Sequence, residues 1–210
     1  MEVANIFENN EKGLIYGLMG NINLSTNNNN YKIITDYKFN GTVKEYLNSP
    51  KDVSSLKMVL LNEQVLTKTS LDLSFGDLKK VSLAKALIEN KDYIVLNYFE
   101  KEQNHQEKEY FKRLWKKLTN EYHKTIIIFT NDISSFWDIS SSFLYVDNNQ
   151  VINTISKKEY FKIMVTINKP EIVKITNLIK AKNIAIEDYQ DIKDLLKAIY
   201  RLKENESWNI

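Results

Sequence analysis

The sequence contains no cysteine, no excess of one charge sign and no long apolar run, and each absence excludes a class of protein. Without cysteine the chain forms neither disulfides nor thiolate metal sites, which fits a reducing compartment. Its 29 basic and 27 acidic residues are interspersed, so the broad basic surface typical of nucleic-acid-binding proteins is missing. The longest apolar runs, such as 126–129, have the length of a strand and fall far short of the ~20 residues that span a bilayer. We therefore expect an intracellular protein whose main ligand is neither DNA nor RNA.

The composition that remains is that of a globular protein. Hydrophobic residues make up 43% of the chain and charged residues 27%, which is close to the average of soluble domains. A length of 210 residues suffices for one α/β domain with a small appendage. The first twenty residues lack the basic-then-apolar plan of a secretory signal. We expect a cytoplasmic protein that contacts the inner face of the cell membrane only through partners.

The first half of the chain predicts short elements. Residues 13–19 are apolar and run into a loop rich in Asn, Ser and Thr, which indicates a strand followed by a polar loop over 21–30. We expect a second strand over 31–37, a short helix over 42–48 that stops before Pro50, and a third short strand over 57–61.

In the second half, helices and strands alternate. Helical spacing over 77–89 and 107–122, the latter with Phe111, Leu114, Trp115 and Leu118 inward, alternates with buried strands at 93–96 and 125–129. This order predicts an α/β fold with a mostly parallel sheet and crossover helices. A short helix from Asp132 and a hairpin with its turn at 147–149 complete the sheet.

After about residue 155 only helical patterns remain. They cover 157–167, 171–182 and 192–202, with Pro170 at a first helical position and Asp191 as a cap of the last helix. We therefore divide the chain into a core, 1–154, and a helical C-terminal unit, 155–210.

One segment carries a resemblance to a known family. Leu73, Ser74, Phe75, Gly76 and Asp77, with the helix after them, look like the signature motif of ABC-type ATPases. In that family the Ser hydroxyl and Gly N–H of the signature contact the γ-phosphate of ATP held by the opposite subunit, which is anion capture at a helix N-terminus. An amphipathic helix capped by Ser and Asp explains the same residues without a nucleotide. The resemblance implies a P-loop NTPase-like ABC ATPase core.

Four positions depart from the family in the same direction. The strand 93–96 resembles Walker B, but Asn97 stands where the Mg²⁺-associated Asp is expected and Tyr98 where the catalytic Glu is expected. Asn104 replaces the Asp of the D-loop, and Asn131 replaces the His of the switch motif. Glu100, close by, is interpreted as a solvated surface acid. Together the four substitutions predict loss of hydrolysis.

The P-loop is also degenerate. Gly17 and Gly20 resemble its strand and first glycine. Ser25 and Thr26 resemble a remnant of its Mg²⁺-binding hydroxyl pair, although a plain polar loop explains them better. The later Gly and the Lys that cradle phosphates are missing, so ATP binding at the chain's own site is not expected.

The spacing of the motifs also departs from the family. The segment between Gly20 and Ser74 is too short for a complete helical subdomain, which is expected to be truncated, and either Asn62 or Gln64 marks the Q-loop.

The C-terminal unit resembles the appendage of energy-coupling-factor and related importer ATPases, which helps to pair two ATPase subunits. The similar stretches are 169–173 and 191–196, and a plain helical hairpin packed on the core explains them as well. His105 and His123 have no other ligand residues at metal spacing, so no metal site is expected.

These patterns favour one function and leave others open. The first is a catalytically impaired subunit that pairs with an intact ABC ATPase, and through it with a transmembrane permease, so that ATP and Mg²⁺ bind only at a composite site. The second is a nucleotide-independent interaction, regulatory or protective protein that uses the fold as a scaffold. An active ATPase with unorthodox residues is a third.

Overall fold

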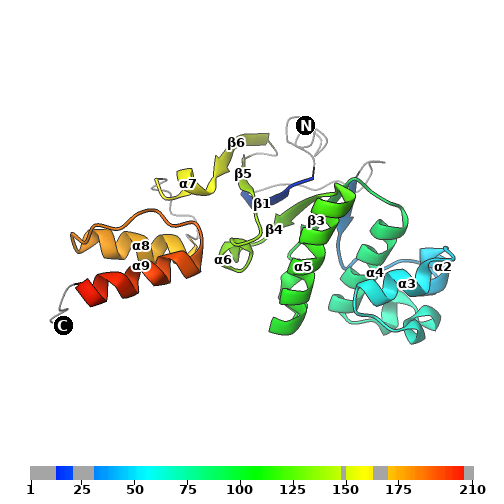
Figure 1. The fold of residues 1–210 in the computed structure, drawn as a ribbon. Helices are drawn as coiled ribbons and strands as arrows, with labels where there is room; N and C mark the ends of the chain where they lie inside the picture. The colour runs from blue at the N-terminus through cyan, green and yellow to red at the C-terminus, as the bar shows by residue number, and fades with distance from the viewer. Residues whose placement is uncertain (1–12, 21–30, 148–149, 163–169, 206–210) are drawn as a thin grey trace.

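The computed structural model describes residues 13–20, 31–147, 150–162 and 170–205 (Figure 1). In this part of the chain six strands form one sheet in the spatial order β2-β3-β4-β1-β5-β6. The strands are β1 (Ile15–Gly20), β2 (Tyr31–Ile34), β3 (Tyr93–Asn97), β4 (Thr125–Phe129), β5 (Ser142–Asp147) and β6 (Gln150–Ser156). Neighbours run parallel from β2 to β5, and β6 pairs antiparallel with β5 at the edge. The mostly parallel sheet and the hairpin are confirmed, while the strand predicted over 31–37 ends at Ile34.

The central strands are buried on both faces. In β4, Ile126 and Ile128 belong to a large cluster with residues of the helices, and Ile127 between them belongs to a smaller cluster on the opposite face. Helices α4 (Phe75–Ile88) and α5 (His105–Tyr122) supply much of the large cluster. This double burial explains why the strand is an unbroken apolar run without polar alternation.

The two long helices are those predicted, each beginning two residues earlier than expected. Phe111, Leu114, Trp115 and Leu118 of α5 are buried, which confirms the expected inward face. Lys80 of α4 and Glu107 of α5 join the helices through an ion pair of 2.5 Å. Within the described ranges, no helix has both the length and the apolar character needed to cross a bilayer.

A small helical segment lies between β2 and α4 (Figure 1). It contains α2 (Val43–Leu47), α3 (Asp52–Met58) and the 3₁₀ turns η1 (Glu63–Thr67) and η2 (Ser70–Asp72). Thr42 begins α2 with a capping box, in which Glu45 N–H donates to the Thr42 hydroxyl and Thr42 N–H donates to the Glu45 carboxylate. The short helix predicted over 42–48 is confirmed.

The prediction of a strand over 57–61 is wrong. Residues up to Met58 belong to α3, and the chain then turns at Leu60, whose φ is +62°. Leu61 N–H donates back to the Leu56 carbonyl at 2.9 Å, which closes the end of the helix. Leu56, Val59 and Leu61 are all buried, and a short apolar run of this kind does not by itself distinguish a helix end from a strand.

Among the described residues, three helices follow the sheet. They are α7 (Lys157–Tyr160), α8 (Glu171–Ala181) and α9 (Ile192–Asn205). Asp191 Oδ1 accepts from Lys193 N–H at 2.7 Å, so the predicted cap at Asp191 is confirmed. Pro170 lies one position earlier than expected, at the N-cap of α8. The helix predicted over 157–167 stops at Tyr160, and residues 163–167 lie outside the described residues.

The C-terminal helices pack against the core through one aromatic cluster. The rings of Trp137 and Phe143 stack 5.1 Å apart, and Tyr160, Val173 and Leu195 are buried in the same cluster. Trp137 Nε1–H also donates to the Gln190 carbonyl at 2.8 Å. The division of the chain at residue 154 stays a prediction, and this cluster spans it.

The substitution Gly17→Ala is expected to lower the free energy of unfolding by about 1–3 kcal/mol. Gly17 is buried in β1, and a Cβ there would lie 2.5 Å from the Phe143 ring. Urea titration followed by circular dichroism measures the loss. Phe143→Leu removes the ring that the new methyl meets, so the double variant should lose less than the sum of the two single losses. Additive losses would contradict the steric account.

Candidate functional site

The segments that follow β3 and β4 lie side by side at the carboxyl edge of the sheet. Parallel register places Asn97 opposite Phe129, so both strands end at one level. The Tyr98 hydroxyl donates to Asn131 Oδ1 at 3.4 Å. Helix α4 reaches the same place, since Lys79 Nζ donates to the Tyr98 carbonyl at 2.8 Å. In open α/β sheets, ligands bind at this edge.

The residues that resemble the signature motif begin α4. Ser74 is its N-cap and accepts from Asp77 N–H at 3.1 Å, while the side chain of Phe75, next in the chain, is exposed. The first turn of a 14-residue helix presents N–H groups and the positive end of the helix dipole, which attract anions.

Two carboxyl groups lie at the same turn. Asp77 is in the turn itself, and a Cβ on Gly76 would lie 3.1 Å from the Cβ of Glu102. Negative charges here reduce the attraction for phosphate.

Tyr98 occupies the position where the family resemblance places a catalytic carboxylate, and it is held by packing. Its backbone is left-handed, with φ +47°, which costs a residue other than glycine of order 1 kcal/mol. Its ring meets Phe129 edge-on at 4.9 Å between centroids, and Lys101 Nζ lies 4.0 Å from the ring centroid. Tyr98 N–H donates to the Phe129 carbonyl at 2.9 Å. Asn97, directly before it, ends β3 and brings an amide where a Mg²⁺ ligand would need a carboxylate.

The interpretation of Glu100 as a solvated surface acid is wrong. Glu100 lies in the 3₁₀ turn η3 (Phe99–Glu102) and is 5% exposed. Its Oε1 accepts from the Thr130 hydroxyl at 2.6 Å, and Thr130 Oγ1 accepts from Asp132 N–H at 2.9 Å. Its Oε2 is buried and has no hydrogen-bond partner among the described residues. The sequence gives little signal of this, because the partner lies 30 positions away on another segment.

Asn104 has a structural task at the start of α5. Its side chain accepts from Glu107 N–H at 2.9 Å, and Asn104 N–H donates to Glu107 Oε2 at 3.1 Å, which is a capping box. Burial alone would raise the pKa of the Glu107 carboxyl, but the Lys80 ammonium and the Asn104 N–H hold it below its usual value. A resemblance to the D-loop is therefore not needed to explain Asn104.

The glycines that resemble a P-loop lie in or at the end of β1. Gly17 is buried within the strand against Phe143, and Gly20 is its last residue, opposite Val146 of β5. Ser25 and Thr26 lie outside the described residues.

The structure leaves the choice of Q-loop residue open. Asn62 caps η1, accepting from Gln64 N–H at 3.0 Å, and both side chains are exposed.

No group of three or more His, Asp or Glu side chains in the described ranges is placed to hold a metal ion. His105 is the first residue of α5, and His123 ends the same helix with φ +53°. The two histidines thus stand at the start and at the end of α5, which accounts for their positions without a metal ion.

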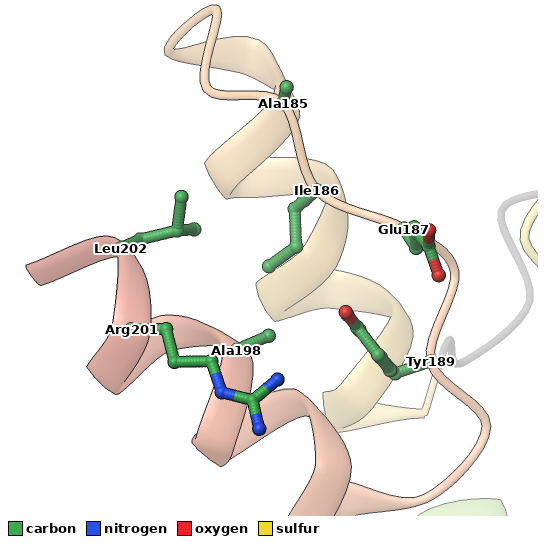
Figure 2. A pocket seen from close by; sticks show the side chains of 7 residues that line it. All are labelled: Ala185, Ile186, Glu187, Tyr189, Ala198, Arg201 and Leu202. Atoms are coloured by element: carbon green, nitrogen blue, oxygen red, sulfur yellow. The ribbon is translucent and has the colours of Figure 1, made fainter. Parts of the chain in front are cut away.

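Two cavities lie at the C-terminal unit, away from the signature. One, of about 500 Å³, is a groove between α9 and the segment before it, lined by Ala185, Ile186, Glu187, Tyr189, Ala198, Arg201 and Leu202 (Figure 2). The other, of about 370 Å³, lies between α5, α6 (Ile133–Phe136) with the residues after it, and the starts of α8 and α9. Lys112 lines it and pairs with Glu109 at 3.0 Å and Asp138 at 3.4 Å, and Glu171 and Asp191 make the lining acidic on balance.

Comparison with known proteins gives matches in structure alone. No family model matches the sequence, and no curated protein matches it. The dimeric post-hydrolysis state of the ATP-binding cassette MJ0796, bound to ADP and Pi, is similar with a TM-score of 0.52 and 21% identity over 60% of this chain. The match spans 62% of that cassette, less than two thirds of its length.

Two further structures match over more of the chain. The cbiO1 protein of Clostridium perfringens, part of the ABC transporter complex cbiONQ, has a TM-score of 0.55 and 18% identity, over 81% of this chain and 86% of its own. An ATP-binding subunit of an ABC transporter has a TM-score of 0.61 and 11% identity, over 79% and 88%. At such identities the matches establish the fold: this chain has the fold of ABC-type ATP-binding cassettes.

Two replacements of Ser74 test its role as the N-cap of α4. Ser74→Ala should lower the free energy of unfolding by about 1 kcal/mol, because Asp77 N–H loses its acceptor. Ser74→Asp keeps an acceptor at the N-cap and should change stability by only a few tenths of a kcal/mol or less. Urea titration of the three proteins checks both values. Equal stability of the Ala variant and the parent would exclude the capping role.

Proposed function

We propose that this chain is a catalytically impaired, ABC transporter ATP-binding-like subunit that pairs with a competent ATPase and contributes its signature motif to the partner's ATP site. The observation that supports this most is the contrast between two ends of secondary structure. The first turn of α4 keeps Ser74 and Gly76 at an N-terminus, whereas β3 ends in Asn97 and Tyr98 without a carboxylate.

The chain's own residues do not supply the chemistry of hydrolysis. Binding Mg²⁺ between phosphates calls for one or two carboxylates, and activating water calls for a base within hydrogen-bond reach. The nearest carboxyl group after β3, that of Glu100, is buried and bonded to Thr130. In a composite site the partner would provide the P-loop, the Mg²⁺ site and the base.

The contribution of this chain would be a set of donors. The Ser74 hydroxyl accepts from Asp77 N–H, and its own hydrogen is able to donate to a phosphate oxygen. The N–H groups of the first turn and the helix dipole add to this attraction. Because Asp77 and Glu102 oppose it, the turn alone would bind phosphate weakly. Tight binding would need the cations of the partner's site.

The C-terminal unit supports pairing. Its outer surface exposes large apolar side chains on both helices, with Leu178 of α8 67% exposed, Leu196 of α9 47% and Tyr200 of α9 66%. Leu196 and Tyr200 are four residues apart on one face of α9, and Ala198 and Arg201, which line the groove of Figure 2, lie on another face of the same helix. Apolar side chains gathered on a surface are typical of protein interfaces.

The similar structures fit the same scheme. MJ0796 is dimeric, and cbiO1 is part of a transporter complex. We extend these properties to this chain: an intact ABC ATPase as partner, a transmembrane permease behind it, and a cytoplasmic location at the inner face of the membrane.

A second candidate is a nucleotide-independent interaction or regulatory protein. The acidic groups of Asp77 and Glu102 at the signature turn favour it, as does the packing of Tyr98 against Phe129. Calorimetric titration with ATP of this chain alone, of the partner alone and of the two together separates the two functions. Tighter binding by the two together than by the partner alone supports the first, and ATP binding by the partner that this chain leaves unchanged supports the second.

The trans role is tested by mixing the chain with an intact ATPase encoded next to it and measuring phosphate release. The parent chain should raise the partner's rate, and Ser74→Asp should reduce that rate by about tenfold or more, because a negative charge replaces a hydroxyl donor. Ser74→Ala removes the cap and the hydroxyl donor together and should lower the rate as well, whereas Ser74→Asp keeps a cap acceptor. If Ser74→Asp and Ser74→Arg both leave the partner's rate and ATP-dependent association unchanged, the trans role is wrong.

Pairing through the C-terminal unit is tested with two exposed tyrosines. Tyr200→Asp should weaken association with the partner about tenfold, since aromatic side chains dominate interface energies. Tyr122→Asp, at the far end of α5 with 54% exposure, makes the same change elsewhere and should leave association unchanged. Analytical ultracentrifugation measures both. Equal behaviour of the two variants would place the interface elsewhere.

A further inference from the structure

The segment 98–102 lies between the loop after β4 and the first turn of α4, which carries Ser74 of the proposed composite site. It follows β3 and comprises Tyr98 and η3. On one side is the loop after β4, and on the other is the first turn of α4. We call residues 98–102 the bridge segment. It contacts both sides through polar groups that are buried or closely packed.

Its contact with the loop after β4 is a short hydrogen bond. The Thr130 hydroxyl donates to Glu100 Oε1 at 2.6 Å and accepts from Asp132 N–H. Because Glu100 Oε2 is already buried without a partner among the described residues, losing Thr130 would leave both carboxyl oxygens unpaired. Burying a polar group without a hydrogen-bond partner costs free energy. A movement that separates the bridge segment from this loop is therefore unfavourable.

Its contact with α4 has two points. Lys79 is buried to 7% exposure, and its ammonium group donates to the Tyr98 carbonyl at 2.8 Å. Gly76 lies so close to Glu102 that a Cβ would approach the Glu102 carbonyl oxygen to 3.5 Å. The first turns of α4 therefore follow any movement of the bridge segment.

The middle of the bridge segment is anchored. Phe99 is 3% exposed, and its ring meets those of Phe111 and Trp115 at 4.9 and 5.6 Å. Tyr98 and Glu102, at the two ends of the anchored segment, contact α4, and Glu100 between them contacts the loop after β4, so the segment links these two elements.

We propose that Glu100 is a positioning residue, which holds the signature turn of α4 in place through the bridge segment and couples it to the loop at Thr130–Asp132. A ligand or partner that moves either side would then alter the other, since such coupling is reciprocal. Segments coupled in this way open together in hydrogen exchange.

The test uses the isolated chain without nucleotide, so it can fail while the trans role of Ser74 stands. Amide exchange by NMR follows Leu78, whose N–H donates to the Ser74 carbonyl at 2.9 Å, and Ile127 in the sheet, which reports global opening. Thr130→Val should speed exchange at Leu78 about threefold or more relative to Ile127. Thr119→Val is the matched control, because Thr119 is buried and its hydroxyl bonds only to carbonyls of α5, among the described residues.

The reverse direction completes the test and serves if Thr130→Val fails to fold. Gly76→Ala presses a methyl group on Glu102 and should speed exchange of the Asp132 amide, which lies on the far side of the bridge segment. Glu100→Gln keeps an acceptor for Thr130 and should exchange like the parent at Leu78. Exchange that rises only at the mutated side, or equally at Ile127, would overturn the coupling.

Discussion

Parallel pairing of β3 with β4 brings Asn97 opposite Phe129, and most of the site geometry depends on this register. Two strands that end at the same level deliver their following segments to one edge of the sheet. There Tyr98 reaches Asn131, and Glu100 reaches Thr130. The register itself rests on buried apolar strands, in which a shift by one residue would turn Ile126 and Ile128 to the wrong face. The hydrophobic core therefore decides which polar groups meet.

At the carboxyl edge of the sheet, uncharged side chains with packing or capping contacts stand where the family resemblance leads one to expect charged ones. Where the family resemblance leads one to expect carboxylates, Tyr98 packs edge-on against Phe129 and Asn104 caps α5. The nearest carboxyl group after β3, that of Glu100, is buried and accepts a hydrogen bond from Thr130. The side chains of Tyr98, Asn104 and Glu100 therefore all have structural contacts at this edge.

Large apolar side chains are exposed at the start of α4 and on α9. Phe75 beside Ser74 and the side chains of Leu196 and Tyr200 on α9 remain uncovered in this chain, while the interior is closely packed. Trp137 of the core contacts Tyr160 of the C-terminal unit, and Val173 and Leu195 are buried in the same cluster, so both exposed regions belong to one packed structure. A subunit that acts only in combination would have this distribution of order and exposure.

The sequence by itself determined the order of elements, because the hydrophobic periods of strands (two residues) and of helices (3.6 residues) are local properties that can be read along the chain. It also determined which residues stand at the ends of β3 and at the start of α4, namely Asn97, Tyr98 and Ser74, on which the proposed function rests. It could not determine that residues 57–58 end a helix, because Leu56, Val59 and Leu61 fit either period over so short a run. Only the tertiary structure decided that Glu100 is buried. Its partner Thr130 lies in the loop after β4, far away in the sequence, and burial is a property of the assembled core.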